Sequence, residues 1–93
     1  MRDIKSGDIV KHFKRETLTE EILKKNPTMY LYGVIDTDVQ HTETGEKFVV
    51  YKALYGSGKV FARPQEMFFS KVDKEKYPDI KQEYRLEKID GEF

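Results

Sequence analysis

Four side chains suited to binding a ligand occur close together in the middle of the sequence: Tyr51, Tyr55, Arg63 and Glu66. If residues 47–55 and 59–63 form paired strands, both tyrosines share one face of the first strand and Arg63 lies on its neighbour. An arginine beside aromatic rings can hold a carboxylate, a phosphate or a planar ring by forked hydrogen bonds and stacking. The alternative is structural: Arg63 pairs with Glu66 to tie a turn, and the tyrosines fill the core.

His41 is a further candidate, because an imidazole near carboxylates can act as a general base. With Glu43 or Glu66 it would suit a small hydrolase or a metal-dependent enzyme. His12 could join His41 as a metal ligand only if the fold brings them together, and no third ligand is present at metal spacing. The sequence therefore predicts no catalytic residue, no metal site and no cofactor, and it favours binding over catalysis.

Composition narrows the classes of function. The 93 residues include 17 basic and 17 acidic side chains and no cysteine. A net charge of zero gives no long-range attraction to a phosphate backbone, so nucleic acid is an allowed but not a favoured partner. Without cysteine, and without an apolar run of about 18 residues, we expect a cytoplasmic protein with no membrane contact. Its length predicts one domain over residues 1–93, present as a monomer or a weak homodimer.

The first third of the chain changes from a strand pattern to a helix pattern. Residues 8–14 alternate in polarity and predict a first strand. Thr19 can cap a short helix over residues 19–25, which has glutamates in its first turn and lysines in its last, and Pro27 ends it. This helix belongs to an insertion at about residues 17–28.

Strand-forming residues dominate the middle third. Residues 29–35 predict a second strand, in which Gly33 indicates a bulge or a close approach by another segment. A turn over residues 42–46, with Gly45, leads into residues 47–55, whose apolar side chains occur at both parities. That pattern predicts a central strand covered on both faces.

The last third continues the meander. A tight turn at residues 56–58 lets residues 59–63 pair with the preceding strand, and Pro64 ends the ladder. Residues 67–69, Met-Phe-Phe, are expected to plug the core. After Pro64 we expect a helical turn and a short strand at 68–72. The C-terminal extension, over about 73–93, is expected to contain a helix or loop at 73–82, a strand at 84–89 and a frayed end at 90–93. Together these elements predict a mainly β protein, a small SH3-like antiparallel barrel or roll with one short inserted helix.

Four segments resemble, in this order, the bacterial family known as domain of unknown function 1653: 11-KHFK-14, 41-HTETGE-46, 49-VVYKALYG-56 and 62-ARPQEMF-68. The resemblance covers about residues 5–89 and implies a small SH3-type barrel, but it implies no activity. The positions that match the family pattern are His12, His41, Glu43, Thr44, Gly45, Tyr51, Tyr55, Arg63, Pro64, Met67 and Phe68. The insertion and the acidic approach to His41 depart from that pattern.

These observations favour a binding or interaction module. Its ligand would be a small anionic or planar molecule, or a short peptide or protein partner, held on a barrel face. The residues expected to form this site are Tyr51, Tyr55, Arg63, His41 and Glu66. A nucleic-acid-binding barrel is the first alternative, because small barrels often bind strands through aromatic rings and lysines. A small hydrolase or metal-dependent enzyme is the second.

Overall fold

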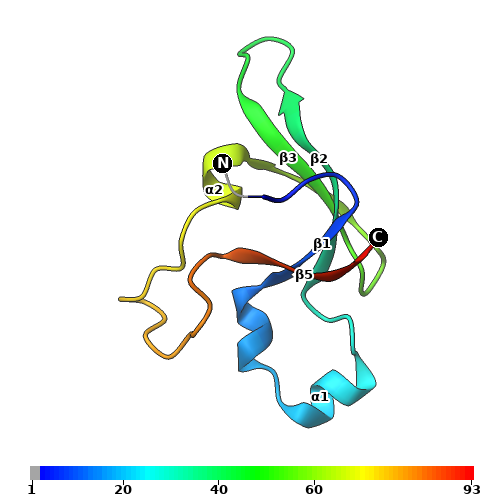
Figure 1. The fold of residues 1–93 in the computed structure, drawn as a ribbon, viewed down its shortest axis with the longest axis vertical. Coiled ribbons are helices and arrows are strands. Elements are labelled where there is room, and N and C mark those ends of the chain that lie inside the picture. Colours follow the sequence, from blue (N-terminus) through cyan, green and yellow to red (C-terminus); the bar gives the residue numbers. More distant parts are fainter. Residues whose placement is uncertain (1–2) are drawn as a thin grey trace.

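The structure, a computed structural model, describes residues 3–93. Within this range five antiparallel strands form one sheet in the order β4-β3-β2-β1-β5. The strands are β1 (Asp8–His12), β2 (Leu31–Gln40), β3 (Lys47–Ala53), β4 (Val60–Pro64) and β5 (Leu86–Glu92). Three short helices connect them: the 3-10 helix η1 (Phe13–Thr17), α1 (Glu20–Lys25) and α2 (Gln65–Phe68) (Figure 1). The prediction of a mainly β fold is confirmed.

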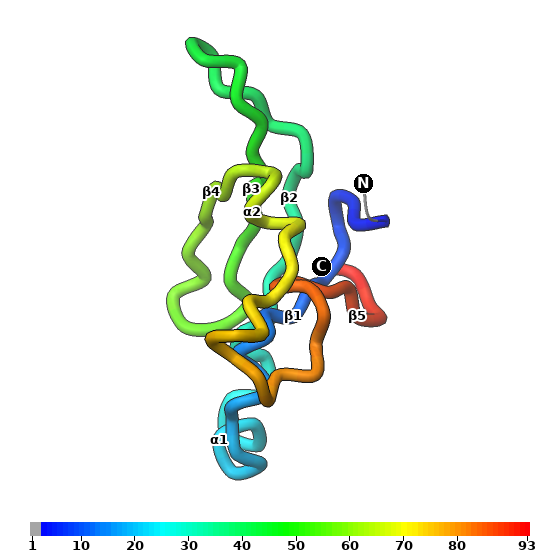
Figure 2. Tube along the Cα trace, turned by 90° about the vertical axis from the view of Figure 1, so that its left-hand side faces the viewer, coloured from blue at the N-terminus to red at the C-terminus, as the bar shows by residue number. Residues whose placement is uncertain are grey.

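The sheet is open. β4 and β5 are its two edges and do not pair with each other. Residues 65–85 connect these edges and cross one face of the sheet (Figure 2). Because no ladder joins the two edges, the sheet is not closed, and the expected SH3-like barrel is not confirmed.

The main core lies between the sheet and α2. Phe68 of α2 is completely buried against side chains of the strands, including Val10, Val34, Val49 and Leu86. Of the expected core plug, Phe68 is therefore confirmed, whereas Met67 is 48% exposed. A second cluster joins η1 to the long connection and consists of Phe13, Val72 and Ile80, with Tyr77 packed against it.

The central strand is β2, so the prediction that residues 47–55 form the centre was wrong. β3 lies one place further out, and its burial alternates: Val49, Tyr51 and Ala53 are buried, while the residues between them are partly exposed. The prediction took the apolar residues at both parities of 47–55 as evidence that both faces of this strand are covered. The pattern within one strand does not show how many strands lie on each side, and here β1 and β5 both extend the sheet beyond β2.

Two local signals gave correct elements. Thr19 caps α1, its side-chain oxygen accepting a hydrogen bond from the backbone N–H of Ile22 at 3.2 Å. The turn between β2 and β3 has Gly45 at a φ of 75°, where a glycine avoids the strain that a Cβ would bring. The first strand, however, ends at His12, because residues 13 and 14 belong to η1.

The last third differs most from the prediction. The expected strand at 68–72 is reduced to one bridge between Lys71 and Tyr84. Of the two alternatives predicted for residues 73–82, a helix or a loop, the structure has the loop, which contains turns. The chain end does not fray: β5 runs to Glu92, and the N–H of Phe93 donates to the Gly7 carbonyl at 2.9 Å.

The close approach expected at Gly33 is confirmed, and the approaching group is the side chain of Phe93. The ring of Phe93 lies so near that a Cβ on Gly33 would overlap it. The irregularity in the β2–β3 ladder comes just after, between Val34 and Asp36. The close approach is therefore what requires a glycine at position 33.

Candidate functional site

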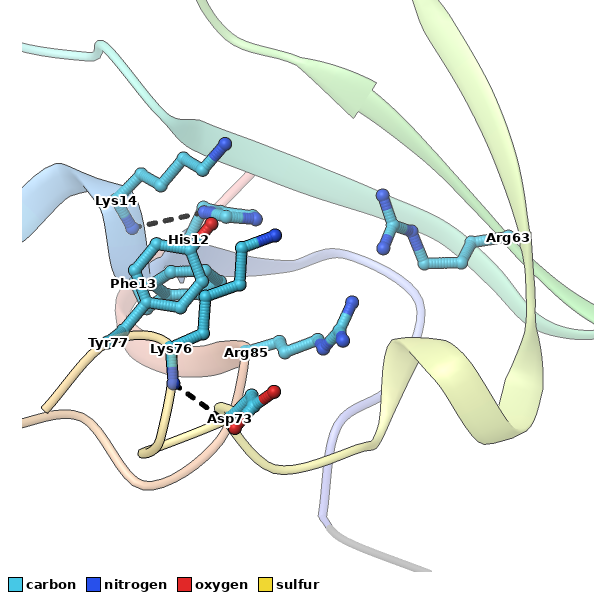
Figure 3. A pocket seen from close by; sticks show the side chains of 8 residues that line it. All are labelled: His12, Phe13, Lys14, Arg63, Asp73, Lys76, Tyr77 and Arg85. Atoms are coloured by element: carbon cyan, nitrogen blue, oxygen red, sulfur yellow. Dashed lines mark hydrogen bonds between the residues drawn. The ribbon is translucent and has the colours of Figure 1, made fainter. Parts of the chain in front are cut away.

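A pocket of about 300 Å³ opens where the ends of β1 and β4 meet the residues just before β5. Its lining, shown in Figure 3, consists of His12, Phe13, Lys14, Arg63, Asp73, Lys76, Tyr77 and Arg85. Four of these side chains are lysine or arginine, and one is an aspartate. The pocket is therefore cationic in a protein whose net charge is zero.

His12 forms one wall because it is the residue at which β1 becomes η1. Its Nδ1 accepts a hydrogen bond from the backbone N–H of Lys14 at 3.1 Å and so caps η1. The ring is stacked on that of Phe13, with centroids 4.4 Å apart. In a neutral imidazole whose Nδ1 is an acceptor, the proton sits on Nε2, which remains available as a donor.

The opposite wall is the loop over residues 73–82, which η1 holds in place. The carboxylate of Glu16 accepts hydrogen bonds from the backbone N–H groups of Lys81 and Gln82, at 2.9 and 2.8 Å. Burial raises the pKa of Glu16, but these two bonds, with Lys11 and Lys74 nearby, together hold it below its ordinary value.

The side chain of Gln82 ties the same loop to the sheet. It is buried, and its amide nitrogen donates to the Lys11 carbonyl of β1 at 3.0 Å and to the Tyr84 carbonyl at 2.9 Å. The loop that carries Asp73, Lys76 and Tyr77 is thus fixed against β1 by polar contacts.

Arg63 enters the pocket from β4. It pairs with Val49 in the β3–β4 ladder, and its Nε donates to the hydroxyl of the buried Tyr51 at 3.1 Å. Figure 3 shows its guanidinium reaching across the open space toward His12 and Arg85. The hydroxyl of Tyr51 therefore positions Arg63 and leaves the rest of the guanidinium for a ligand.

Arg85 approaches from the residue just before β5. Its Nε is buried, and no described group accepts a hydrogen bond from it. Over residues 3–93, neither Arg85 nor Arg63 takes part in an ion pair. A buried donor without an acceptor is unfavourable, and a charged one more so.

The surrounding cations also set the state of His12. Burial, followed by the charges of Lys14, Arg63 and Arg85, lowers its pKa to about 4. The ring is therefore neutral at pH 7. Asp73 is the one acidic side chain of the lining, and its Oδ1 accepts hydrogen bonds from the backbone N–H groups of Glu75 and Lys76.

The sequence-predicted site residues separate in space. Arg63 lines the pocket and Tyr51 lies behind it. Tyr55 is not part of the pocket lining, and its hydroxyl shares a 2.7 Å hydrogen bond with that of Tyr32. Glu66 lines a different hollow of about 360 Å³ with Glu46, Lys47, Pro64 and Gln65. Among the described residues it forms no ion pair with Arg63, so the turn-tying pair considered above is not present.

His41 lies at the start of the turn of the β2–β3 hairpin, which stands away from the rest of the chain (Figures 1 and 2). Its Nδ1 accepts hydrogen bonds from the backbone N–H groups of Glu43 and Thr44, at 3.1 and 3.2 Å. It is exposed and does not line the pocket that contains His12. Among residues 3–93, no three histidine or acidic side chains are grouped closely enough to hold a metal ion.

Sequence reasoning missed most of the pocket. The sequence predicted a site role for His12 only as a metal ligand, and it predicted none for Lys14, Lys76 or Tyr77. The segment 11-KHFK-14 was a usable signal, because it is one of the four that resemble the family. Arg85 had no comparable signal, since it reaches the pocket only through the antiparallel pairing of β5 with β1.

Comparison with known families shows which family contains this chain. A family model described as a protein of unknown function, DUF1653, matches residues 8–88. The chain belongs to the DUF1653 family. The match confirms the resemblance noted above and spans every residue of the pocket, from His12 to Arg85. No curated protein and no solved structure matches this DUF1653 chain.

None of the helices in the described range is long and apolar enough to cross a membrane. The cytoplasmic location and the oligomeric state stay predictions.

Proposed function

We propose that this protein is a non-catalytic module that binds a small oxyanion, such as a phosphate or carboxylate group, in the pocket between His12, Arg63 and Arg85. The observation that carries the proposal is the convergence in the pocket of two guanidinium groups that have no ion-pair partner among residues 3–93. An oxyanion would accept hydrogen bonds from their terminal nitrogens.

Energetics support this assignment. Hydrogen bonds to charged groups are worth about 1.5–3 kcal/mol each. Arginine is suited to oxyanions because its planar fork can donate two parallel hydrogen bonds. An anion would also relieve the repulsion among the cations that line the pocket.

The neutral state of His12 fits binding better than catalysis. Its Nδ1 is already occupied by the Lys14 N–H, so the ring offers the pocket a donor at Nε2 rather than a free base. Such a donor would add one uncharged hydrogen bond to an oxyanion. The enzyme alternative built on His41 has less support, because both hydrogen bonds to His41 Nδ1 come from its own turn.

Titration with inorganic phosphate, sulfate and acetate, followed by NMR at about 50 mM salt, tests the proposal. Phosphate and sulfate are expected to shift the resonances of His12 and of the arginine side chains in the pocket. Arg63→Gln and Arg85→Gln should each weaken binding by about tenfold or more, because each removes a charge-assisted hydrogen bond.

The matched control is Lys24→Gln, which removes the same charge from the exposed surface of α1. It should leave the affinity unchanged to within about twofold, since exposed charges at this distance are screened. Equal losses for all three variants would mean that net charge alone attracts the anion, and the proposed pocket would then be wrong.

A further inference from the structure

A connected set of aromatic side chains extends from the pocket over the inner face of the sheet. We call it the aromatic row, and its members are Tyr30, Tyr55, Tyr32, Tyr51 and Phe61. Tyr30 begins it, with ring centroids 5.9 Å from His12 and 5.8 Å from Tyr55.

The other end of the aromatic row returns to the pocket. The Tyr55 ring lies 5.6 Å from that of Tyr32, and Tyr32 lies 5.3 Å from Tyr51, whose hydroxyl accepts the hydrogen bond from Arg63. Phe61 packs on both Tyr32 and Tyr51 and is 38% exposed. The row thus joins the histidine and one arginine of the pocket.

Tyr30 has an unusual backbone. It is the third residue of a turn closed by a 2.9 Å hydrogen bond from the Leu31 N–H to the Thr28 carbonyl, and its φ is 62°. Turns of this kind normally have glycine or asparagine there, since positive φ is strained for a bulky side chain. Glycine or asparagine would form the turn with less strain, so what tyrosine adds is its ring. Strain of this kind is typical of functional positions.

The ring that this turn holds is half-buried and lies against His12, which lines the pocket. An aromatic ring against one wall of a pocket that also contains two arginines matches the chemistry of a nucleotide, which carries a flat base and a phosphate. Bases stack on such rings without a demand for a particular base. A pocket of about 300 Å³ in a protein of zero net charge suits a single phosphate rather than a long run of them.

We propose that the oxyanion is the phosphate of one nucleotide unit, with its base stacked on Tyr30 and its phosphate between Arg63 and Arg85. This inference rests on the proposed function, because it assumes that the pocket binds the phosphate. The nucleotide unit could come from a free mononucleotide or from a short single strand, since both carry the same base and phosphate.

Comparison of ribose 5-phosphate with adenosine 5′-monophosphate isolates the contribution of the base. Both should bind the wild-type protein, and the adenine should increase the affinity by about tenfold through stacking. Tyr30→Asn should abolish that increase and leave the affinity for ribose 5-phosphate unchanged. Since asparagine tolerates positive φ, the variant should keep the turn.

Phe48→Leu is the matched control, because it removes an aromatic ring from β3 outside the aromatic row. It should keep the full contribution of the base. If ribose 5-phosphate and adenosine 5′-monophosphate bind equally well, the aromatic row is not a base-stacking surface, and the nucleotide inference fails while the anion site stands. If neither binds, both proposals fail.

A short oligoadenylate distinguishes the two sources. Affinity higher than that of the mononucleotide, together with a steeper fall as salt increases, would identify a single strand as the ligand. Equal affinity would identify the free nucleotide. Binding of the oligoadenylate that survives Tyr30→Asn and Arg85→Gln unchanged would place it elsewhere on the surface and overturn the inference.

Discussion

His12 and His41 occupy the same kind of local position and have different surroundings. Each lies where a strand ends and a turn or 3-10 helix begins. Each uses Nδ1 to accept a hydrogen bond at 3.1 Å from the backbone N–H two residues further on, which belongs to Lys14 in one case and Glu43 in the other. Judged by local contacts alone, both histidines are caps.

Tertiary contacts separate them. His41 is exposed at the tip of a hairpin, where the nearest ring, that of Phe48, lies 6.3 Å away. His12 is half-buried, stacked on Phe13 and surrounded by Lys14, Arg63 and Arg85, which form no ion pair within residues 3–93. The comparison teaches that one local motif can close a turn in one place and line a binding pocket in another, depending on what the fold packs around it.

The largest expected difference between the two histidines is in stability. His12→Ala should lower the free energy of unfolding by about 2–3 kcal/mol at pH 7, because it removes a cap together with a packed ring. His41→Ala should lower it by about 0.5–1 kcal/mol, the value of an exposed cap. Urea denaturation followed by circular dichroism measures both. Equal losses would show that packing around His12 contributes nothing beyond its cap.

The pH dependence of stability gives the next largest effect. The pKa of His12 is about 4 in the folded protein, against 6.5 for the ordinary group, so the unfolded chain binds more protons between these values. The free energy of unfolding should therefore be fully developed above pH 6.5 and fall as the pH drops toward 4. Allowing for partial exposure, the His12 contribution should be about 1–2 kcal/mol.

Denaturation of the wild type and of His12→Gln at a series of pH values measures that contribution as the difference between the two curves. Saturating sulfate should raise the pKa of His12, as followed by NMR, because it neutralises Lys14, Arg63 and Arg85 around the ring. A His12 resonance that titrates near 6.5 without any ligand would contradict the cationic surroundings.

The smallest expected effect is an increase in the free energy of unfolding. Arg85→Met replaces the orphaned donor with an apolar chain of similar length, and it removes one of the cations that repel each other in the pocket. The free energy of unfolding should rise by about 0.5–1 kcal/mol while sulfate binding is lost. Thermal unfolding with and without sulfate measures both quantities. If Arg85→Met is less stable than the wild type, the guanidinium stabilises the fold and is not kept for ligand binding.

Helices and turns could be predicted where a single residue determines the local backbone conformation. Thr19 and the charges after it specified α1, and Gly45 specified the hairpin turn. Residues 70–85 were not predictable in this way. Their course depends on the hydrogen bonds from Lys81 and Gln82 to Glu16, which is distant in the sequence.

The candidate site was predictable only in part. The sequence pointed to Arg63 and to its partner Tyr51, because residues on paired strands a short turn apart must lie close together. It also proposed His41 and Glu66, which lie outside the pocket, and it overlooked Arg85. No periodicity within a segment reveals which side chains meet when the first and last strands of the sheet pair.

The sequence by itself determined that this protein is mainly β, that its middle strands form a meander around tight turns, and that it belongs to a family through short motifs. Those features depend on backbone preferences and on residues close along the chain. Only the tertiary structure decided that His12, Arg63 and Arg85 share one pocket. The physical reason is that their proximity depends on the β1–β5 pairing and on the packing of the last connection over the sheet, which bring together groups that local preferences do not relate.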